Sequence, residues 1–139
     1  YTVLFYFKNS SYNKLLRKEY PTKNEIKKME NDIYRLFKDY NNLSKQNNYR
    51  LIIVLRPDKL EILNEQYEYD FTALTSNLRD SLNIEVFDLL PYYKKKINDL
   101  GIDINDLFWK FDGHHNSKGY KMMSEGIYEY LFPDNSKMN

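Results

Sequence analysis

The feature that most constrains the fold is a continuous apolar run at residues 51–55, Leu-Ile-Ile-Val-Leu, closed by Arg56 and Pro57. A strand with one face in water alternates apolar and polar residues, whereas a continuous apolar run is typical of a strand that is buried on both faces. Strands of that kind occur in parallel sheets that helices cover on both sides. The run therefore predicts an α/β fold.

A long amphipathic helix is predicted before this strand. Thr22 and Glu25 form a capping-box pattern at its start, and the pair Asn47-Asn48 ends it. Apolar residues follow the cap at spacings of three and four and predict the face that packs. They are Ile26, Met29, Ile33, Leu36, Phe37, Tyr40 and Leu43.

The same alternation continues after the strand. The second half of residues 58–82 predicts a helix, residues 84–88 predict a strand, and a short helix follows Pro91 and ends at Gly101 as its C-cap. Residues 107–111 predict a third strand, and Ser117 is expected to cap the last helix. This order predicts a three-layer α/β/α sandwich on a parallel sheet.

The chain length fits one domain, residues 1–139. Three strands make a small sheet, so we expect either a further strand within residues 1–8, which are compatible with a strand or with the end of a helix, or missing parts of the domain upstream. The sequence predicts a fold that is incomplete at its N-terminus.

Composition excludes several classes of function. Lys and Arg total 21 against 20 Asp and Glu, so no strongly charged surface for nucleic acid is predicted. There is no Cys, which removes thiolate zinc sites and cysteine nucleophiles, and no Gly before Gly101, which removes a glycine-rich phosphate loop. No apolar run reaches the roughly 18 residues that span a bilayer, so no membrane contact by this segment is expected.

The chemistry is expected at the carboxyl ends of the strands, where open α/β sheets bind ligands. Both histidines of the chain, His114 and His115, lie in one such loop beside Asp112. Three interpretations are open: a Ser-His-Asp arrangement in which Asp orients the base, a metal site with Asp112, His114 and His115 as ligands, or histidines that only pack and cap. The metal interpretation is the weakest, because three ligands within four residues rarely converge on one ion.

The longer pattern resembles a known family. Asp112, His114, Asn116 and Gly119, read as Asp-x-His-x-Asn-x-x-Gly before an amphipathic helix, resemble the last block of the SGNH/GDSL hydrolases. The strands at residues 51–57 and 86–89 are also similar to strands of that family. The resemblance implies a flavodoxin-like α/β/α fold and an acyl ester hydrolase or O-acetyltransferase that acts on acylated small molecules or glycans.

The resemblance also implies roles for single residues. His114 would be the general base and Asp112 its orienting carboxylate, with His115 as the alternative base because many members have Asp-x-x-His. Asn116 would hold the turn, and Gly119 would allow close helix packing. No metal and no organic cofactor is implied, and the family's tendency points to the cell envelope or the extracellular space.

The nucleophile of such a triad is not identified. Ser10 and Ser11 follow an apolar run but lack the Gly and Asp that surround the family's serine, so we expect the serine outside this chain. This chain alone is then expected to be inactive. The alternative is a non-catalytic α/β binding or interaction domain that retains the histidine loop. Two further strand-end residues have simpler predicted roles, Arg56 in a structural salt bridge and Asp88 as a helix cap.

Overall fold

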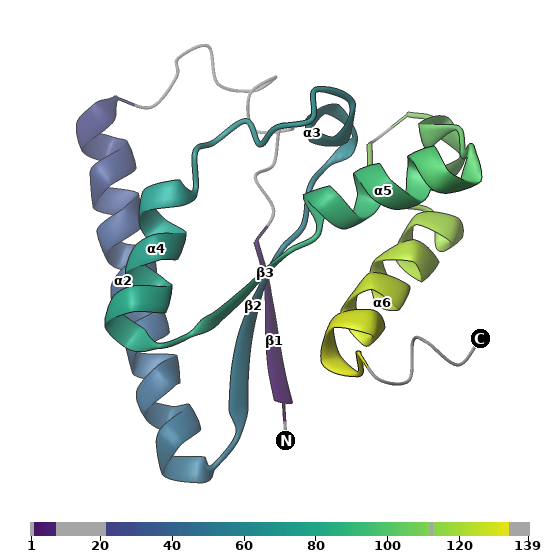
Figure 1. Ribbon diagram of the computed structural model, residues 1–139. Helices are drawn as coiled ribbons and strands as arrows, with labels where there is room; N and C mark the ends of the chain where they lie inside the picture. The colour runs from purple at the N-terminus through teal and green to yellow at the C-terminus, as the bar shows by residue number, and fades with distance from the viewer. Residues whose placement is uncertain (1, 8–21, 112, 134–139) are drawn as a thin grey trace. The chain divides into compact units, whose positions relative to one another are not determined.

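The structure, a computed structural model, describes residues 2–7, 22–111 and 113–133, and it is a mixed α/β chain (Figure 1). These residues group into two compact units. The first covers Tyr1–Val54 and Tyr69–Val86, and the second covers Leu55–Glu68 and Phe87–Asn139. The predicted triad residue Asp112 and the serines Ser10 and Ser11 lie outside the described residues.

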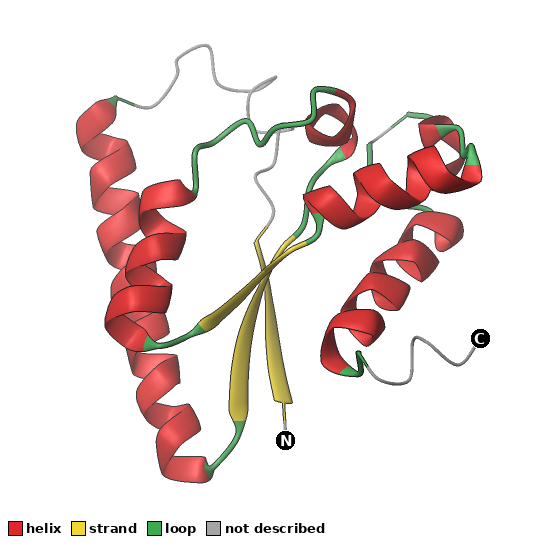
Figure 2. Ribbon diagram, viewed as in Figure 1, coloured by secondary structure: helices red, strands yellow, loops and turns green. Residues whose placement is uncertain are grey.

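Three strands form one sheet in the order β1-β2-β3, drawn in yellow in Figure 2. Their bounds are Thr2–Phe7, Arg50–Leu55 and Glu85–Asp88. In β2, Ile52, Ile53 and Val54 are each 0% exposed. Successive side chains of a strand point to opposite faces, so both faces of β2 are buried. The prediction of a doubly buried strand is confirmed, and the sheet contains a parallel pair of strands.

In the first unit, helices α2 (Lys23–Asn47) and α4 (Thr72–Leu82) pack side by side (Figure 1). The capping box is present: the Thr22 hydroxyl accepts from the Glu25 N–H, and the Glu25 carboxylate accepts from the Thr22 N–H at 2.7 Å. Asn48 ends α2 in the left-handed conformation with φ 54°. The predicted bounds of this helix are therefore confirmed.

The predicted packing face of α2 is wrong in part. The buried residues of α2 are Phe37, Asn41 and Ser44, whereas Met29 and Leu36 are 44% and 50% exposed. Asn41 can be buried because its amide nitrogen donates to the carbonyl of Leu82, the last residue of α4, at 2.7 Å. The side of α2 that is covered is the side that faces α4. The hydropathy of the α2 residues does not show where α4 lies.

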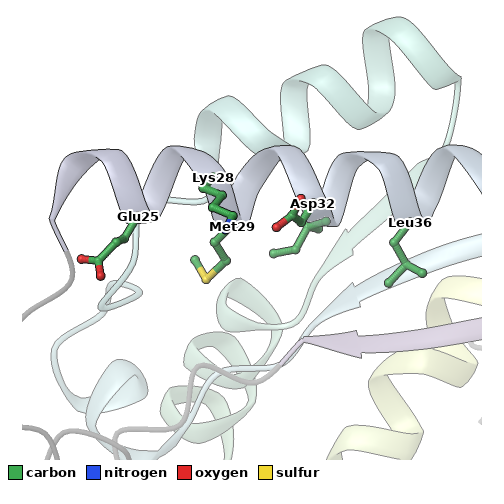
Figure 3. Close-up of a pocket in the computed structure, with 6 residues that line it drawn as sticks. Glu25, Lys28, Met29, Asp32 and Leu36 are labelled. Atoms are coloured by element: carbon green, nitrogen blue, oxygen red, sulfur yellow. The ribbon is translucent and has the colours of Figure 1, made fainter.

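The apolar stripe that remains on α2 borders a shallow hollow. Figure 3 shows Met29 and Leu36 projecting from the same side of the helix. The residues that line this hollow all belong to α2: Glu25, Lys28, Met29, Asp32, Ile33 and Leu36. It contains neither histidine, and it belongs to a different unit from the histidine loop.

The described residues of the second unit form three α-helices and one 3-10 helix. They are α3 (Lys59–Leu63), α5 (Leu90–Leu100), η1 (Ile104–Leu107) and α6 (Ser117–Leu131). Pro91 lies in the first turn of α5, and Gly101 caps its end with φ 60°, as predicted. Helix α3 was not predicted, although Asp58 and Glu61 form the same capping box that marks α2.

The third strand predicted at residues 107–111 is wrong. The 3-10 helix η1 ends at Leu107, and only Phe108 makes a β-bridge, an antiparallel one with His115. Leu107 and Phe108 are buried, whereas Trp109 and Phe111 lie at the surface. The apolar run is therefore a turn that buries its first half, because the chain folds back on itself instead of joining the sheet.

The cap predicted for the last helix is also wrong by one residue. Asn116, not Ser117, is the N-cap of α6: its side-chain oxygen accepts from the N–H groups of Lys118 and Gly119. Asn and Ser are both good caps, so the sequence offered two neighbouring candidates. Asn116 is selected because its amide nitrogen has a second set of partners in the turn before the helix.

Candidate functional site

The histidine loop is built by a tight return of the chain between η1 and α6. Gly113 has φ 65°, a left-handed conformation that glycine adopts without strain. The return brings the Trp109 N–H within 2.8 Å of the His114 carbonyl and the Asn116 N–H within 3.0 Å of the Leu107 carbonyl. These backbone hydrogen bonds fix the loop on which both histidines lie.

Asn116 joins the two sides of this loop. Its amide nitrogen donates to the carbonyls of Asp106 at 2.8 Å and Phe108 at 3.3 Å, while its oxygen caps α6. One side chain thus satisfies backbone groups of η1 and of α6, which would otherwise lack partners at the helix end. The structural role that the resemblance implies for Asn116 fits this geometry.

Gly119 is required by a close approach of backbone to backbone. A Cβ atom at this position would lie 2.1 Å from the Leu107 carbonyl oxygen and 2.6 Å from the His115 ring. Both distances are shorter than any contact between these atoms allows, so no larger residue fits without movement of η1 or α6. Close packing, the role implied for Gly119, agrees with these distances.

His115 lies in the core of the second unit with a 2% exposed side chain. Its Nδ1 is 3.2 Å from Nη1 of Arg56, and its Nε2 is 2.9 Å from the hydroxyl of Tyr93. The ring also packs against that of Phe108 with centroids 4.4 Å apart. Arg56 directly follows β2, and Tyr93 lies in α5, so three segments of the unit meet at this imidazole.

The direction of these hydrogen bonds follows from the donors available. The Arg56 guanidinium can only donate, so Nδ1 of His115 must accept. The Tyr93 hydroxyl donates to the Gly119 carbonyl at 3.1 Å, so it accepts from Nε2–H of His115. The imidazole is therefore neutral with its proton on Nε2, because a proton on Nδ1 would face the guanidinium N–H.

Tyr93 supports this assignment. Its side chain is fully buried, and burial raises the pKa of its hydroxyl above the ordinary value, while the nearby charge of Arg56 partly opposes that rise. The hydroxyl therefore keeps its proton and can donate it to Gly119. The resulting chain of donors runs from Arg56 through His115 and Tyr93 to the carbonyl of Gly119.

His114 differs from its neighbour in exposure. Its side chain lies at the surface, and its backbone carbonyl accepts from Trp109. The pairing with Asp112 that the resemblance implies involves a residue outside the described ones. The structure thus distinguishes the two candidate bases: both ring nitrogens of His115 are used inside the core, whereas the ring of His114 is reachable from solvent.

Asp88 at the end of β3 is not the N-cap of α5, which is Leu89, but it bonds the first residue of that helix. Its Oδ1 accepts from the Leu90 N–H at 2.9 Å, at the start of α5, and from the Tyr67 hydroxyl at 2.7 Å. Burial raises the pKa of Tyr67, and the hydrogen bond to Asp88 raises it further. Asp88 is therefore held by structural partners.

Arg56 has no carboxylate partner of the predicted kind among the described residues. The expected salt bridge is not formed: none of the ion pairs between described residues includes Arg56. A neutral imidazole takes the place of the carboxylate. The sequence contained no sign of this, because His115 is 59 residues away along the chain.

The serines and the acidic residues of the described part of the chain bear on the nucleophile and on the metal alternative. Among the residues that the structure describes, no serine hydroxyl is hydrogen-bonded to either histidine, and Ser44 and Ser124 donate to carbonyls of their own helices. Within the same residues no group of three or more His, Cys, Asp or Glu could hold a metal ion. Asp112, one of the three ligands considered, is outside that set.

Sequence reasoning missed Tyr93 as a member of this cluster. It is one of 14 tyrosines, and nothing in its local pattern separates it from Tyr92, its neighbour. Tyr92 instead reaches the carboxylate of Glu129 on α6. Only the packing of α5 against α6 distinguishes the two hydroxyls.

No helix in the described part of the chain is both long and apolar enough to cross a bilayer. Comparisons of the whole chain with protein-family models, with curated proteins and with solved structures gave no match.

Proposed function

We propose that this chain carries the general base of an acyl ester hydrolase or O-acyltransferase of the SGNH type, with His114 as that base. The fold would be the three-layer α/β/α sandwich of that family, and the serine nucleophile would come from a segment that these residues do not identify. The substrate would be an acylated small molecule or glycan. The observation that carries the proposal is the contrast between the two histidines of the loop.

Exposure and hydrogen bonding favour His114 over His115. A general base must reach the proton that it removes within about 3 Å in the substrate complex. His115 is 2% exposed, and both of its ring nitrogens have partners in the core. His114 lies at the surface of the same loop, held by the backbone bonds on either side of Gly113.

In the proposed mechanism His114 takes the proton of the serine hydroxyl as the serine attacks the acyl carbonyl. The same proton is then given to the leaving alkoxide, which leaves an acyl-enzyme. Water or a sugar hydroxyl then attacks that ester while His114 takes its proton, and His114 returns this proton to the serine oxygen as the bond between serine and the acyl group breaks. Asp112 would orient the ring and stabilise the imidazolium.

The test is hydrolysis of p-nitrophenyl acetate by the full-length protein and its His114→Ala variant. Removal of a general base is expected to lower kcat by about 100-fold or more. Lys118→Ala is the matched control, because Lys118 is an exposed residue in the first turn of α6, directly after the loop, and its ion pair with Asp106 is long, at 3.5 Å. Equal rates for His114→Ala and the parent protein would remove His114 from the mechanism.

One observation favours the second candidate function, a non-catalytic α/β binding or interaction domain. His115, the alternative base, is 2% exposed and both of its ring nitrogens have partners in the core, which is a structural role for a histidine of this loop. A fluorophosphonate probe separates the two candidates, because it labels an activated serine covalently. Labelling of the full-length protein that slows in His114→Ala supports the hydrolase, and no labelling at all supports the binding domain.

A further inference from the structure

The arginines at the two ends of β2 have hydrogen-bond partners of different charge. Arg50, the first residue of the strand, makes two hydrogen bonds to the Glu85 carboxylate, with its Nη2 at 2.5 Å. Arg56, immediately after the last residue, donates to the neutral ring of His115. The first guanidinium has an anionic partner in the protein, and the second has a neutral one.

The hydrogen bond to His115 fixes the position of the Arg56 side chain without neutralising its charge. The chain of donors from Arg56 ends at the Gly119 carbonyl, and none of its members carries a negative charge. No ion pair in residues 22–111 and 113–133 includes Arg56. The positive charge is therefore held in place and left uncompensated by described carboxylates.

Partial burial of the Arg56 charge without an anionic partner among the described residues is expected to cost free energy of folding. Arg56 is half-buried, and a charge that is partly removed from water loses hydration that a partner usually replaces. A guanidinium has five N–H donors, and His115 takes a hydrogen bond from one nitrogen only. The remaining donors lie at the carboxyl end of β2, the edge at which open α/β sheets bind ligands.

We propose that Arg56 is the binding residue for an oxyanion, a carboxylate or a phosphoryl group, and that His115 and Tyr93 are positioning residues for it. The planar fork of a guanidinium matches two oxygens of such a group, and an ordered fork loses less conformational entropy when it binds. His115 orients the fork through Nδ1, and Tyr93 keeps that nitrogen available as an acceptor by accepting a hydrogen bond from Nε2–H, which holds the ring proton on Nε2.

The test is a titration of the full chain with inorganic phosphate and, separately, with sodium acetate, followed by NMR of the backbone amides. Ionic strength is held constant with sodium chloride, because general screening would otherwise resemble binding. Saturable shifts that include residues 56 and 115 are expected with at least one of the two anions. Phosphate alone indicates a phosphoryl ligand, and acetate indicates a carboxylate.

Three variants make the result specific. Arg56→Gln keeps an N–H donor for His115 and removes the charge, so the affinity is expected to fall by about tenfold or more. Arg56→Lys keeps the charge without the fork, and an intermediate affinity is expected. Arg50→Gln removes the other flanking arginine, and its affinity should equal that of the parent.

The proposal is overturned if the parent chain shows no saturable binding, if Arg56→Gln binds as well as the parent, or if Arg50→Gln loses affinity to the same extent. If Arg56→Gln does not fold, the comparison of Arg56→Lys with Arg50→Gln decides, and equal affinities in those two overturn it. Binding is measured without turnover, so the outcome is independent of whether His114 acts in ester hydrolysis.

Discussion

Nε2 of His115 lies 2.9 Å from the hydroxyl of Tyr93, and this hydroxyl in turn lies 3.1 Å from the carbonyl of Gly119. The two side chains come from α5 and from the loop before α6, and both are buried. A buried polar pair is stable only when each donor and acceptor has a partner. The hydrogen bond between the two side chains keeps the proton of the His115 ring on Nε2. Together with the bond to Gly119, it also joins α5 to α6.

Tyr93→Phe is expected to destabilise the protein. The substitution keeps the ring and removes the hydroxyl, so Nε2–H of His115 and the carbonyl of Gly119 each lose a partner in the core. Leaving such groups unsatisfied costs about 1–3 kcal/mol of the free energy of unfolding, measured by urea denaturation. Tyr120→Phe is the control, because Tyr120 is 48% exposed, and a change within about 0.5 kcal/mol is expected. Equal effects of the two substitutions would contradict the role given to the Tyr93 hydroxyl.

Gly119→Ala is expected to be more destabilising than Gly126→Ala. Both positions lie in α6, so the gain in helix propensity, about 1 kcal/mol, is shared. The new Cβ at residue 119 would meet the Leu107 carbonyl at 2.1 Å, whereas at residue 126 it would meet the ring of Tyr92 at 2.8 Å. Backbone yields less easily than a side chain, and overpacking costs about 1–3 kcal/mol. Thermal unfolding of both variants checks the order, and a Gly119→Ala protein as stable as Gly126→Ala would show that η1 and α6 are farther apart.

Asn116→Ala is expected to cost about 1–2 kcal/mol of unfolding free energy through loss of the α6 cap. Ser117→Ala, at the position predicted from the sequence, is expected to change stability by less than about 0.5 kcal/mol, because Asn116 provides the cap. Asn116→Asp keeps the accepting oxygen and removes the two N–H donors to Asp106 and Phe108, so its stability should lie between those of the other two. If Ser117→Ala were the more damaging substitution, the cap would be assigned to the wrong residue.

At alkaline pH the protein is expected to unfold in the same pH range in which its buried tyrosines ionise. Burial raises the pKa values of Tyr67 and Tyr93 above the ordinary 10.0, so the neutral hydroxyl is favoured in the folded state. Their contribution to stability is present below about pH 10 and is lost as the pH rises beyond it. The tyrosinate absorbance should therefore show an early phase from exposed residues and a late phase that coincides with loss of helical circular dichroism. A single phase that precedes unfolding would show that these hydroxyls are accessible.

The sequence by itself determined the elements whose signals are local. The residues 51–55 predicted β2, Thr22 with Glu25 predicted the start of α2, and Gly101 predicted the end of α5. Each of these depends on hydropathy or on hydrogen bonds within a few residues. The roles that the resemblance implies for Asn116 in the turn and for Gly119 in close packing also agree with the geometry, although the cap of α6 was predicted at Ser117 and is Asn116.

Only the tertiary structure decided which apolar residues of α2 are covered, that residues 107–111 turn back instead of forming a strand, and which histidine is buried. The first depends on where α4 lies, and the second on a bridge between Phe108 and His115. The third depends on Arg56 and Tyr93, which are 59 and 22 residues from His115. Adjacent histidines in a turn are equivalent in a linear pattern, and they become different only when distant donors and acceptors select one ring for the core.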